Sequence, residues 1–210
     1  MRAGQETWHR SNASVANTRF TDLQKIGIYG GSFDPVHHGH LILARFALEK
    51  FVLEKIIFVP TRHSPHKNAS AAPAEARLQM LRSATEGEPQ FAVDDCELQR
   101  DPPSYTIDTV EKIRQKYTNA HLFLLIGDDN LAGLSSWRGF EELRHTVTFI
   151  VLQRAFSPVT HEYLSVDRPI DISATEIRTR IASGRSIRYL VPAAVEQIIR
   201  IHGFYLEATK

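Results

Sequence analysis

Glycine and histidine residues gather in one stretch between residues 30 and 40. It reads Gly-Gly-Ser-Phe-Asp-Pro-Val-His-His-Gly-His, so that His37 and His40 are three positions apart. Adjacent glycines let the backbone approach a ligand closely and present N–H groups to an anion. At the start of a helix, this spacing places both imidazoles on one face beside a partial positive charge. We therefore expect His37 and His40 to stabilise a polyphosphate during group transfer.

A second stretch near the C-terminus has a related composition. Ser173, Ala174 and Thr175 are followed by Arg178, one helical turn later. Hydroxyl and N–H groups at a helix start, with a guanidinium nearby, suit a phosphate. An ordinary capping sequence is the alternative interpretation, because Glu176 stands three residues after Ser173. The two interpretations are compatible.

Other kinds of chemistry find less support in the sequence. The chain contains neither a Walker A sequence nor Gly-x-Gly-x-x-Gly after the first apolar run, and no nucleophile with an accompanying base is evident. The three histidines among residues 37–40 could bind zinc, but no Cys or Glu at ligand spacing accompanies them. The single cysteine, Cys96, is expected to be a small buried residue without a role.

The composition indicates which partners and which cellular compartment to expect. The 210 residues include 25 Lys and Arg and 24 Asp and Glu, a net charge of +1 that gives no reason to expect nucleic acid as a partner. One cysteine favours a reducing cytosol, and the longest apolar run, Leu122–Ile126, is too short to span a membrane. Residues 1–22 are polar and predict a flexible extension rather than a secretory signal. We expect a cytoplasmic protein without membrane contact, and homo-oligomerisation stays open.

Apolar runs alternate with helical periodicity from residue 23 to the end. Six strands are expected, at Ile26–Tyr29, Ile56–Val59, Phe91–Val93, His121–Ile126, Val147–Leu152 and Ile170–Ile172. Helices are expected after Gly39, over Arg77–Ala84, between Ile107 and Tyr117, over Ala174–Ala182 and over Pro192–Ile201. Such alternation predicts one α/β domain over residues 23–210, with a doubly wound, mostly parallel sheet and C-terminal helices. Ligands of these sheets bind at the carboxyl ends of the strands, where the first stretch lies.

The stretch from Gly30 to His40 closely resembles the signature of the nucleotidyltransferase superfamily, which has a Rossmann-like fold. Further motifs make the chain similar to bacterial nicotinate-mononucleotide adenylyltransferases: Pro65-His66-Lys67, Pro103–Thr109, Ile126–Leu131, Trp137 and Ile172–Arg178. The resemblance extends from about Lys25 to Tyr205. It implies transfer of the adenylyl group of ATP to nicotinate mononucleotide by direct in-line attack, giving deamido-NAD and pyrophosphate, with Mg²⁺ carried on the ATP phosphates and no metal ligand assigned to a protein side chain.

The resemblance also implies roles for individual residues. His37 and His40 are the catalytic pair, and His38 is expected at the surface. ATP is expected to contact Gly30, Gly31, Ser32, Phe33, Asp34, Gly127, Asp129, Ser173, Thr175 and Arg178. The mononucleotide is expected to contact Lys67, Tyr105, Thr106, Trp137 and Arg154, although Trp137 alone would also suit simple packing and lysine or arginine alone a solvated surface.

Two points stay open at this stage. Asp128 stands where the family usually has a small residue, and its carboxylate is expected either to interact with Mg²⁺ or to point to solvent. The acceptor is the second point, since nicotinamide mononucleotide or phosphopantetheine would fit the same first motif. A nucleotide-binding module without activity is the remaining alternative, although both histidines are intact.

Overall fold

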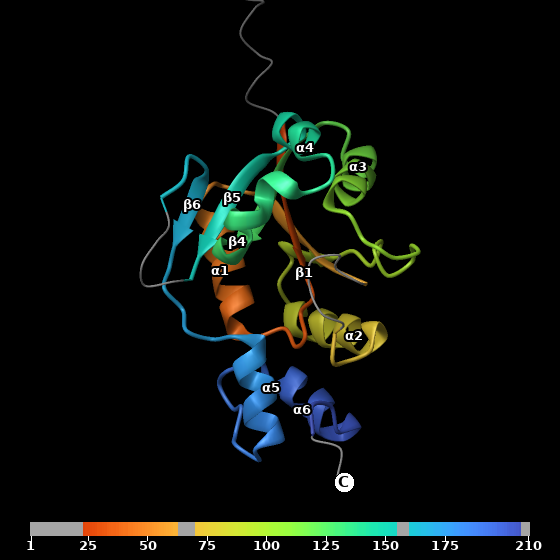
Figure 1. Ribbon diagram of the computed structural model, residues 1–210, viewed down its shortest axis with the longest axis vertical. Helices are drawn as coiled ribbons and strands as arrows, with labels where there is room; N and C mark the ends of the chain where they lie inside the picture. Colours follow the sequence, from red (N-terminus) through yellow and green to blue (C-terminus); the bar gives the residue numbers. More distant parts are fainter. Residues whose placement is uncertain (1–22, 63–69, 155–159, 207–210) are drawn as a thin grey trace, which may run out of the picture.

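A six-stranded sheet positions the functional stretches at the carboxyl ends of its strands. The computed structural model describes residues 23–62, 70–154 and 160–206 (Figure 1). The strands are β1 (Gln24–Gly31), β2 (Lys55–Pro60), β3 (Phe91–Val93), β4 (Ala120–Gly127), β5 (Thr148–Gln153) and β6 (Leu164–Asp167). They lie in the order β3-β2-β1-β4-β5-β6, and every pair is parallel. The expected α/β sheet is thus confirmed.

Helices cover both faces of this sheet. They are α1 (His38–Lys50), α2 (Ala74–Thr85), α3 (Thr106–Lys116), α4 (Phe140–Thr146), α5 (Ala174–Ala182) and α6 (Ala193–His202), with a 3₁₀-helix, η1 (Asp128–Ser136). Alternate residues of β4 enter two separate cores. Phe123 and Leu125 pack with α1, whereas Leu122, Leu124 and Ile126 pack with α3 and α4. Burial on both faces explains the uninterrupted apolar run of this strand.

The strand order reverses next to β1. The chain adds β2 and β3 on one side of β1 and then returns to its other side with β4. The connection that follows β1 therefore runs to one face of the sheet, and the connection that follows β4 runs to the other face. This divergence opens a crevice at the carboxyl ends of these two strands. The stretches after Gly31 and Gly127 lie at this crevice. Helix α6 packs against α2, and α5 and α6 lie at the bottom of Figure 1.

One expected strand is wrong. The sixth strand is Leu164–Asp167 rather than Ile170–Ile172, which is irregular. Arg168 and Ile170 still donate their N–H groups to the carbonyls of Gln153 and Arg154 at 3.3 Å, but Pro169 between them has no N–H, so the regular ladder ends before it. Val166 is the one fully buried residue of this edge strand, which left no apolar run to detect. Ile170 and Ile172 instead pack against the core beside α1. The short η1 and α4 were also not expected.

Two further expectations concern residues that the structure does not describe. The extension of residues 1–22 and Lys67 lie outside the described ranges. Within the described ranges, none of the helices is long and apolar enough to cross a membrane.

Candidate active site

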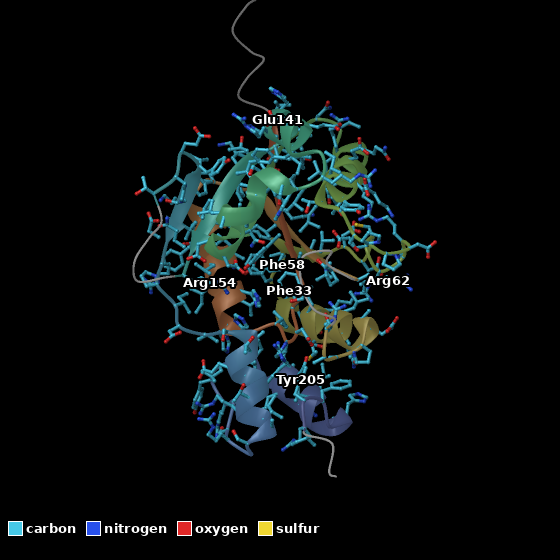
Figure 2. The ribbon with its side chains drawn as sticks, viewed as in Figure 1. Phe33, Phe58, Arg62, Glu141, Arg154 and Tyr205 are labelled. Atoms are coloured by element: carbon cyan, nitrogen blue, oxygen red, sulfur yellow. The ribbon has the colours of Figure 1, made fainter. Side chains whose placement is uncertain are left out.

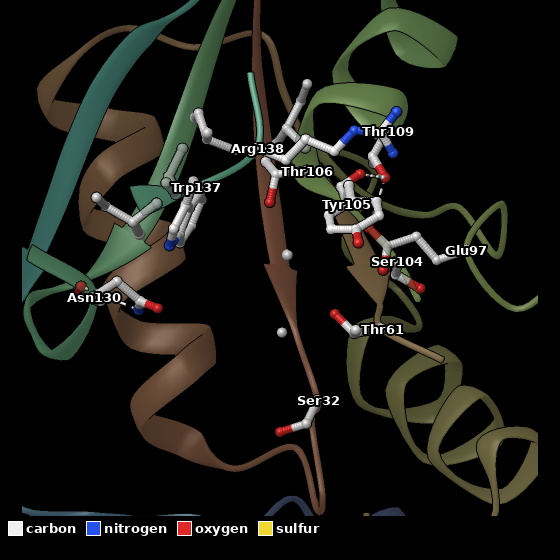
Figure 3. A pocket seen from close by; sticks show the side chains of 17 residues that line it. Ser32, Thr61, Glu97, Ser104, Tyr105, Thr106, Thr109, Asn130, Trp137 and Arg138 are labelled. Carbon is white, nitrogen blue, oxygen red and sulfur yellow. Dashed lines mark hydrogen bonds between the residues drawn. The ribbon is translucent and has the colours of Figure 1, made fainter. Parts of the chain in front are cut away.

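Two adjoining pockets lie in the crevice between β1 and β4. The histidine pocket is lined by His37, His40, Arg154, Ser173, Thr175 and Arg178, among others. The tryptophan pocket is lined by Glu97, Ser104, Tyr105, Thr106, Trp137 and Arg138, among others (Figure 3). Both include Gly30, Gly31, Ser32, Gly127 and Asn130, which come directly from the ends of the two strands. Ligands in the two pockets would therefore meet above these shared residues.

The two motif histidines stack at the start of α1. Their ring centroids are 3.7 Å apart with 26° between the planes, as the spacing predicted. The backbone N–H of His37 donates to Nδ1 of His40 at 3.3 Å. Since Nδ1 accepts, a neutral His40 ring carries its proton on Nε2, which can donate to an anion. Gly39 makes the arrangement possible, because a Cβ there would lie 3.0 Å from Nδ1 of His37.

His37 is held uncharged by its surroundings. Only 1% of the residue is exposed, and its Nδ1 has no hydrogen-bond partner among the described residues. The pKa of His37 is lowered from 6.5 to about 3, chiefly by burial and also by the nearby Arg154 and His38. His37 is therefore a neutral imidazole near pH 7.

The loop from Gly31 to Val36 is fixed by side chains from distant parts of the chain. Buried Arg77 of α2 donates from Nη1 to the carbonyl of Ser32 at 2.6 Å. Arg178 of α5 donates from Nη1 to the carbonyl of Asp34 at 2.7 Å. The ring of Phe33 is buried against Tyr29 and Phe58, so this residue meets the histidine pocket mainly through its backbone.

The carboxylate of Asp34 is fully engaged within the protein. It accepts the N–H groups of Ala71 and Ala72, at 2.6 and 3.1 Å, and the hydroxyl of Tyr205 at 2.7 Å. Tyr205 follows α6, far from Phe33 in sequence but close to the same loop (Figure 2). The side chain of Asp34 therefore ties the loop to the segment before α2 and to the C-terminal segment, and its expected contact with ATP stays a prediction.

The start of α5 combines capping with a phosphate-type arrangement. Ser173 Oγ accepts the N–H of Glu176 at 3.1 Å, so the capping interpretation is confirmed. Arg178 donates from Nη2 to Thr175 Oγ1 at 3.1 Å while its Nη1 holds the first loop. Ser173, Thr175 and Arg178 line the same pocket as the histidines. The two stretches that resemble phosphate sites are thus brought together, as the sequence suggested.

Asp128 turns toward the protein, so the alternative in which it points to solvent is wrong, and its interaction with Mg²⁺ stays a prediction. Its side chain is 12% exposed, and its Oδ2 accepts the backbone N–H of Arg154 at 3.0 Å. Arg154 Nε lies 3.7 Å from Asp128 Oδ1, and Nη2 lies 3.3 Å from Asp129 Oδ1. Both carboxylates therefore orient Arg154. This arginine lies in the histidine pocket, not beside Tyr105, Thr106 and Trp137 with which it was grouped.

The expected acceptor residues Tyr105, Thr106 and Trp137 come together in the tryptophan pocket. Trp137 lies on one side of β1 and Tyr105 on the other (Figure 3). Buried Glu97 stabilises the segment before α3, because Thr109 Oγ1 donates to its Oε1 at 2.6 Å and Arg100 lies 3.9 Å away. Burial raises the pKa of Glu97.

Sequence reasoning missed several residues at the two pockets. Glu97, Arg138 and Asn130 line them, while Arg77 and Tyr205 support the first loop. Arg138 had a local signal, since it directly follows Trp137. Asn130 belongs to the motif Ile126–Leu131, although no role was expected for it, whereas Glu97, Arg77 and Tyr205 carry no spacing that would separate them from surface or packing residues.

Comparisons with known proteins agree with this geometry. Residues 28–180 match the family model described as cytidylyltransferase-like. The chain is 41% identical over 185 residues to a protein of Thermus thermophilus named probable nicotinate-nucleotide adenylyltransferase, covering 86% of this chain and 99% of that protein. A protein of Exiguobacterium sibiricum with the same name is 39% identical over 186 residues, with coverage of 86% and 98%.

A solved structure supports the fold. The nicotinic acid mononucleotide adenylyltransferase of Plasmodium falciparum, complexed with NaAD, matches with a TM-score of 0.74 at 18% identity, covering 87% of this chain and 97% of that one. The chain belongs to the cytidylyltransferase-like family and, within it, to the family of the nicotinate-nucleotide adenylyltransferases.

Proposed function

We propose that this protein transfers the adenylyl group of ATP to nicotinate mononucleotide, giving deamido-NAD and pyrophosphate. The observation that carries the proposal is the pair of pockets that share Gly30, Gly31 and Ser32. A donor and an acceptor held on either side of these residues would bring their phosphates together. The names of the bacterial relatives and the NaAD complex of the Plasmodium falciparum protein support the same substrates.

The histidine pocket suits the triphosphate of ATP. Arg154, Arg178 and the Nε2–H group of His40 supply donors, and the start of α5 supplies backbone N–H groups. An oxygen of the mononucleotide phosphate attacks the α-phosphorus of ATP, and a new P–O bond forms. The bond from the α-phosphorus to the bridging oxygen breaks, and pyrophosphate leaves with the electron pair. Donors fixed around the leaving group stabilise its developing charge, and the protein itself forms no covalent bond.

The tryptophan pocket suits the acceptor. The indole of Trp137 can stack on a pyridine ring, and the first turn of α3 begins at Thr106 with N–H groups that lack helical partners. These groups favour an acidic substituent on the ring. A phosphopantetheine arm has no aromatic ring for Trp137 to stack on, so the pocket favours a pyridine mononucleotide.

Mg²⁺ is expected to arrive with ATP. The described residues contain no group of three or more His, Cys, Asp and Glu side chains arranged to hold a metal ion. Asp34 and Asp129 are the carboxylates that line the histidine pocket; Asp34 is engaged by Ala71, Ala72 and Tyr205, and Asp129 contacts Arg154 and Asn130. This donor set fits an ion held chiefly by substrate phosphates, as is common for Mg²⁺. Bound there, Mg²⁺ would neutralise charge on the phosphates.

An acceptor screen tests the proposal. Purified protein is incubated with ATP and Mg²⁺ and with nicotinate mononucleotide, nicotinamide mononucleotide or phosphopantetheine, and pyrophosphate release is followed. We expect release with nicotinate mononucleotide and formation of deamido-NAD in equal amount. Release only with phosphopantetheine would show that phosphopantetheine, and not nicotinate mononucleotide, is the acceptor. ATP binding without release in any reaction would instead indicate a binding module.

A further inference from the structure

An arginine that no sequence motif indicated lines the tryptophan pocket. Arg138 directly follows Trp137, and its guanidinium carbon lies 4.6 Å from the ring centroid of Tyr105. The side chain reaches from the Trp137 side of the cavity toward Tyr105, near Thr106 (Figure 3). Within residues 23–62, 70–154 and 160–206, no carboxylate forms an ion pair with Arg138. Its charge is therefore available to a ligand.

The backbone around Arg138 is fixed against α3. Trp137 donates its N–H to the carbonyl of Leu134, and Phe140 donates to the carbonyl of Trp137, both at 3.1 Å. Gly139 has a φ of +70°, and a Cβ there would lie 3.2 Å from Ile107. Glycine therefore allows the turn to approach the first turn of α3 closely. This packing sets the base of Arg138 beside Thr106.

Charges around this end of the pocket favour an anion. The first N–H groups of α3 point toward its N-terminal end, where Tyr105 provides no side-chain cap. Ser104 is 8% exposed, and its hydroxyl lies close enough to the carboxylate of Glu97 to lower the pKa of that group, although the contact falls short of hydrogen-bond geometry. Two nearby carboxylates act against the binding of an anion. Glu97 is partly compensated, since its Oε1 accepts from Thr109 and lies 3.9 Å from Arg100 while its Oε2 has no partner among the described residues; Asp108 lies in the first turn of α3 without lining the pocket.

We propose that Arg138 recognises the carboxylate of the acceptor's pyridine ring and so selects the acid mononucleotide over its carboxamide. This inference rests on the proposed function, because it assumes a pyridine ring between Trp137 and Tyr105. A guanidinium forms paired, charge-assisted hydrogen bonds with a carboxylate, whereas a neutral carboxamide accepts with one oxygen only. Stacking on Tyr105 keeps the guanidinium plane oriented for this contact. Arg138 is thus a specificity-determining residue.

Substrate preference provides the test. The variants Arg138→Gln and Arg138→Lys are compared with the unchanged protein by kcat/KM for nicotinate mononucleotide and for nicotinamide mononucleotide. We expect Arg138→Gln to lose about ten- to a hundredfold with the acid, the range expected for hydrogen bonds to a charged group. Its kcat/KM with the amide should fall much less, because the carboxamide accepts with one oxygen only, and its KM for ATP should stay unchanged. Arg138→Lys should retain part of the preference.

Arg144→Gln is the matched control. Arg144 also lies against an aromatic ring, 5.8 Å from the centroid of Phe140, but it lines neither pocket. It should leave the preference unchanged. An equal loss with both mononucleotides, or an unchanged preference in Arg138→Gln, would overturn the inference.

Calorimetric binding of each mononucleotide separates this inference from the proposed function. If the unchanged protein transfers to neither mononucleotide, the proposed function fails. Weaker binding of the acid alone in Arg138→Gln would still support the role of Arg138, and equal binding by both proteins would overturn it.

Discussion

The two pockets share the residues at the ends of β1 and β4 but are built in different ways. The histidine pocket is made of backbone and charged groups that are fixed by contacts from α2, α5 and the C-terminal segment, through Arg77, Arg178 and Tyr205. The tryptophan pocket is lined by the ends of β1 and β4 and by side chains that lie near the start of α3 and along and just after η1. The difference suggests that the first pocket performs the general phosphate chemistry and that the second determines the acceptor.

Loss of a donor in the histidine pocket is expected to have the largest effect. His40→Ala should lower kcat by a factor that corresponds to about 3 kcal/mol, as for an oxyanion-stabilising donor. Because we propose that this pocket holds the phosphates, the loss should be similar with every accepted mononucleotide. Steady-state kinetics measure it, and His38→Ala is the control, since His38 lines neither pocket. A change confined to the acceptor KM would assign His40 to the other pocket.

The neutral state of His37 predicts lower stability in acid. The pKa of His37 is about 3 in the folded protein and 6.5 in the unfolded chain, so below pH 6.5 the unfolded chain binds more protons. The free energy of unfolding should therefore fall as pH decreases below this value, with up to about 1.4 kcal/mol per pH unit from this group. Above pH 6.5 this contribution is constant.

Urea unfolding at several pH values measures this slope. His37→Gln should reduce it between about pH 6.5 and about pH 4, because glutamine does not titrate. Identical slopes in the two proteins would show that His37 accepts a proton in the folded state.

Loss of the indole should affect only the acceptor. Trp137→Ala removes a stacking partner that is worth about 1–3 kcal/mol for an aromatic base. The KM for the mononucleotide should therefore rise about tenfold or more, with the KM for ATP unchanged. Tyr189→Ala is a control on an aromatic side chain that is 78% exposed and lines neither pocket. An equal rise in both KM values would indicate that Trp137 supports the residues that the two pockets share.

A smaller effect is expected from the carboxylate behind Arg154. Asp128→Ala leaves Asp129 as the remaining carboxylate at the guanidinium, 3.3 Å away, so the KM for ATP should rise only about two- to fivefold, within the range for partly exposed ion pairs. The double variant with Arg154→Ala tests whether Asp128 acts through Arg154. In that background Asp128→Ala should have no further effect. A loss of the same size in both backgrounds would contradict this role.

Local patterns predicted much of the fold and of the histidine pocket. His37 and His40 are three positions apart in one helix, and their stacking follows from that spacing. The strands buried on both faces appeared as apolar runs. Edge strand β6 did not, because only Val166 is fully buried.

Contacts between distant residues could not be predicted from such patterns. The bonds of Arg77 to Ser32 and of Tyr205 to Asp34 join residues 45 and 171 positions apart, and only the folded chain brings them together. Asp128 and Arg154 meet for the same reason, since β4 and β5 are neighbours.

Transfer of a label from ATP is the most direct test of the central claim. ATP labelled at its α-phosphate is mixed with the protein, Mg²⁺ and nicotinate mononucleotide, and the products are separated after an acid quench. The label should appear in deamido-NAD, in equal amount to the unlabelled pyrophosphate, and none should stay bound to the protein. Label that remains in ATP, is released as AMP or is attached to the protein would contradict direct adenylyl transfer.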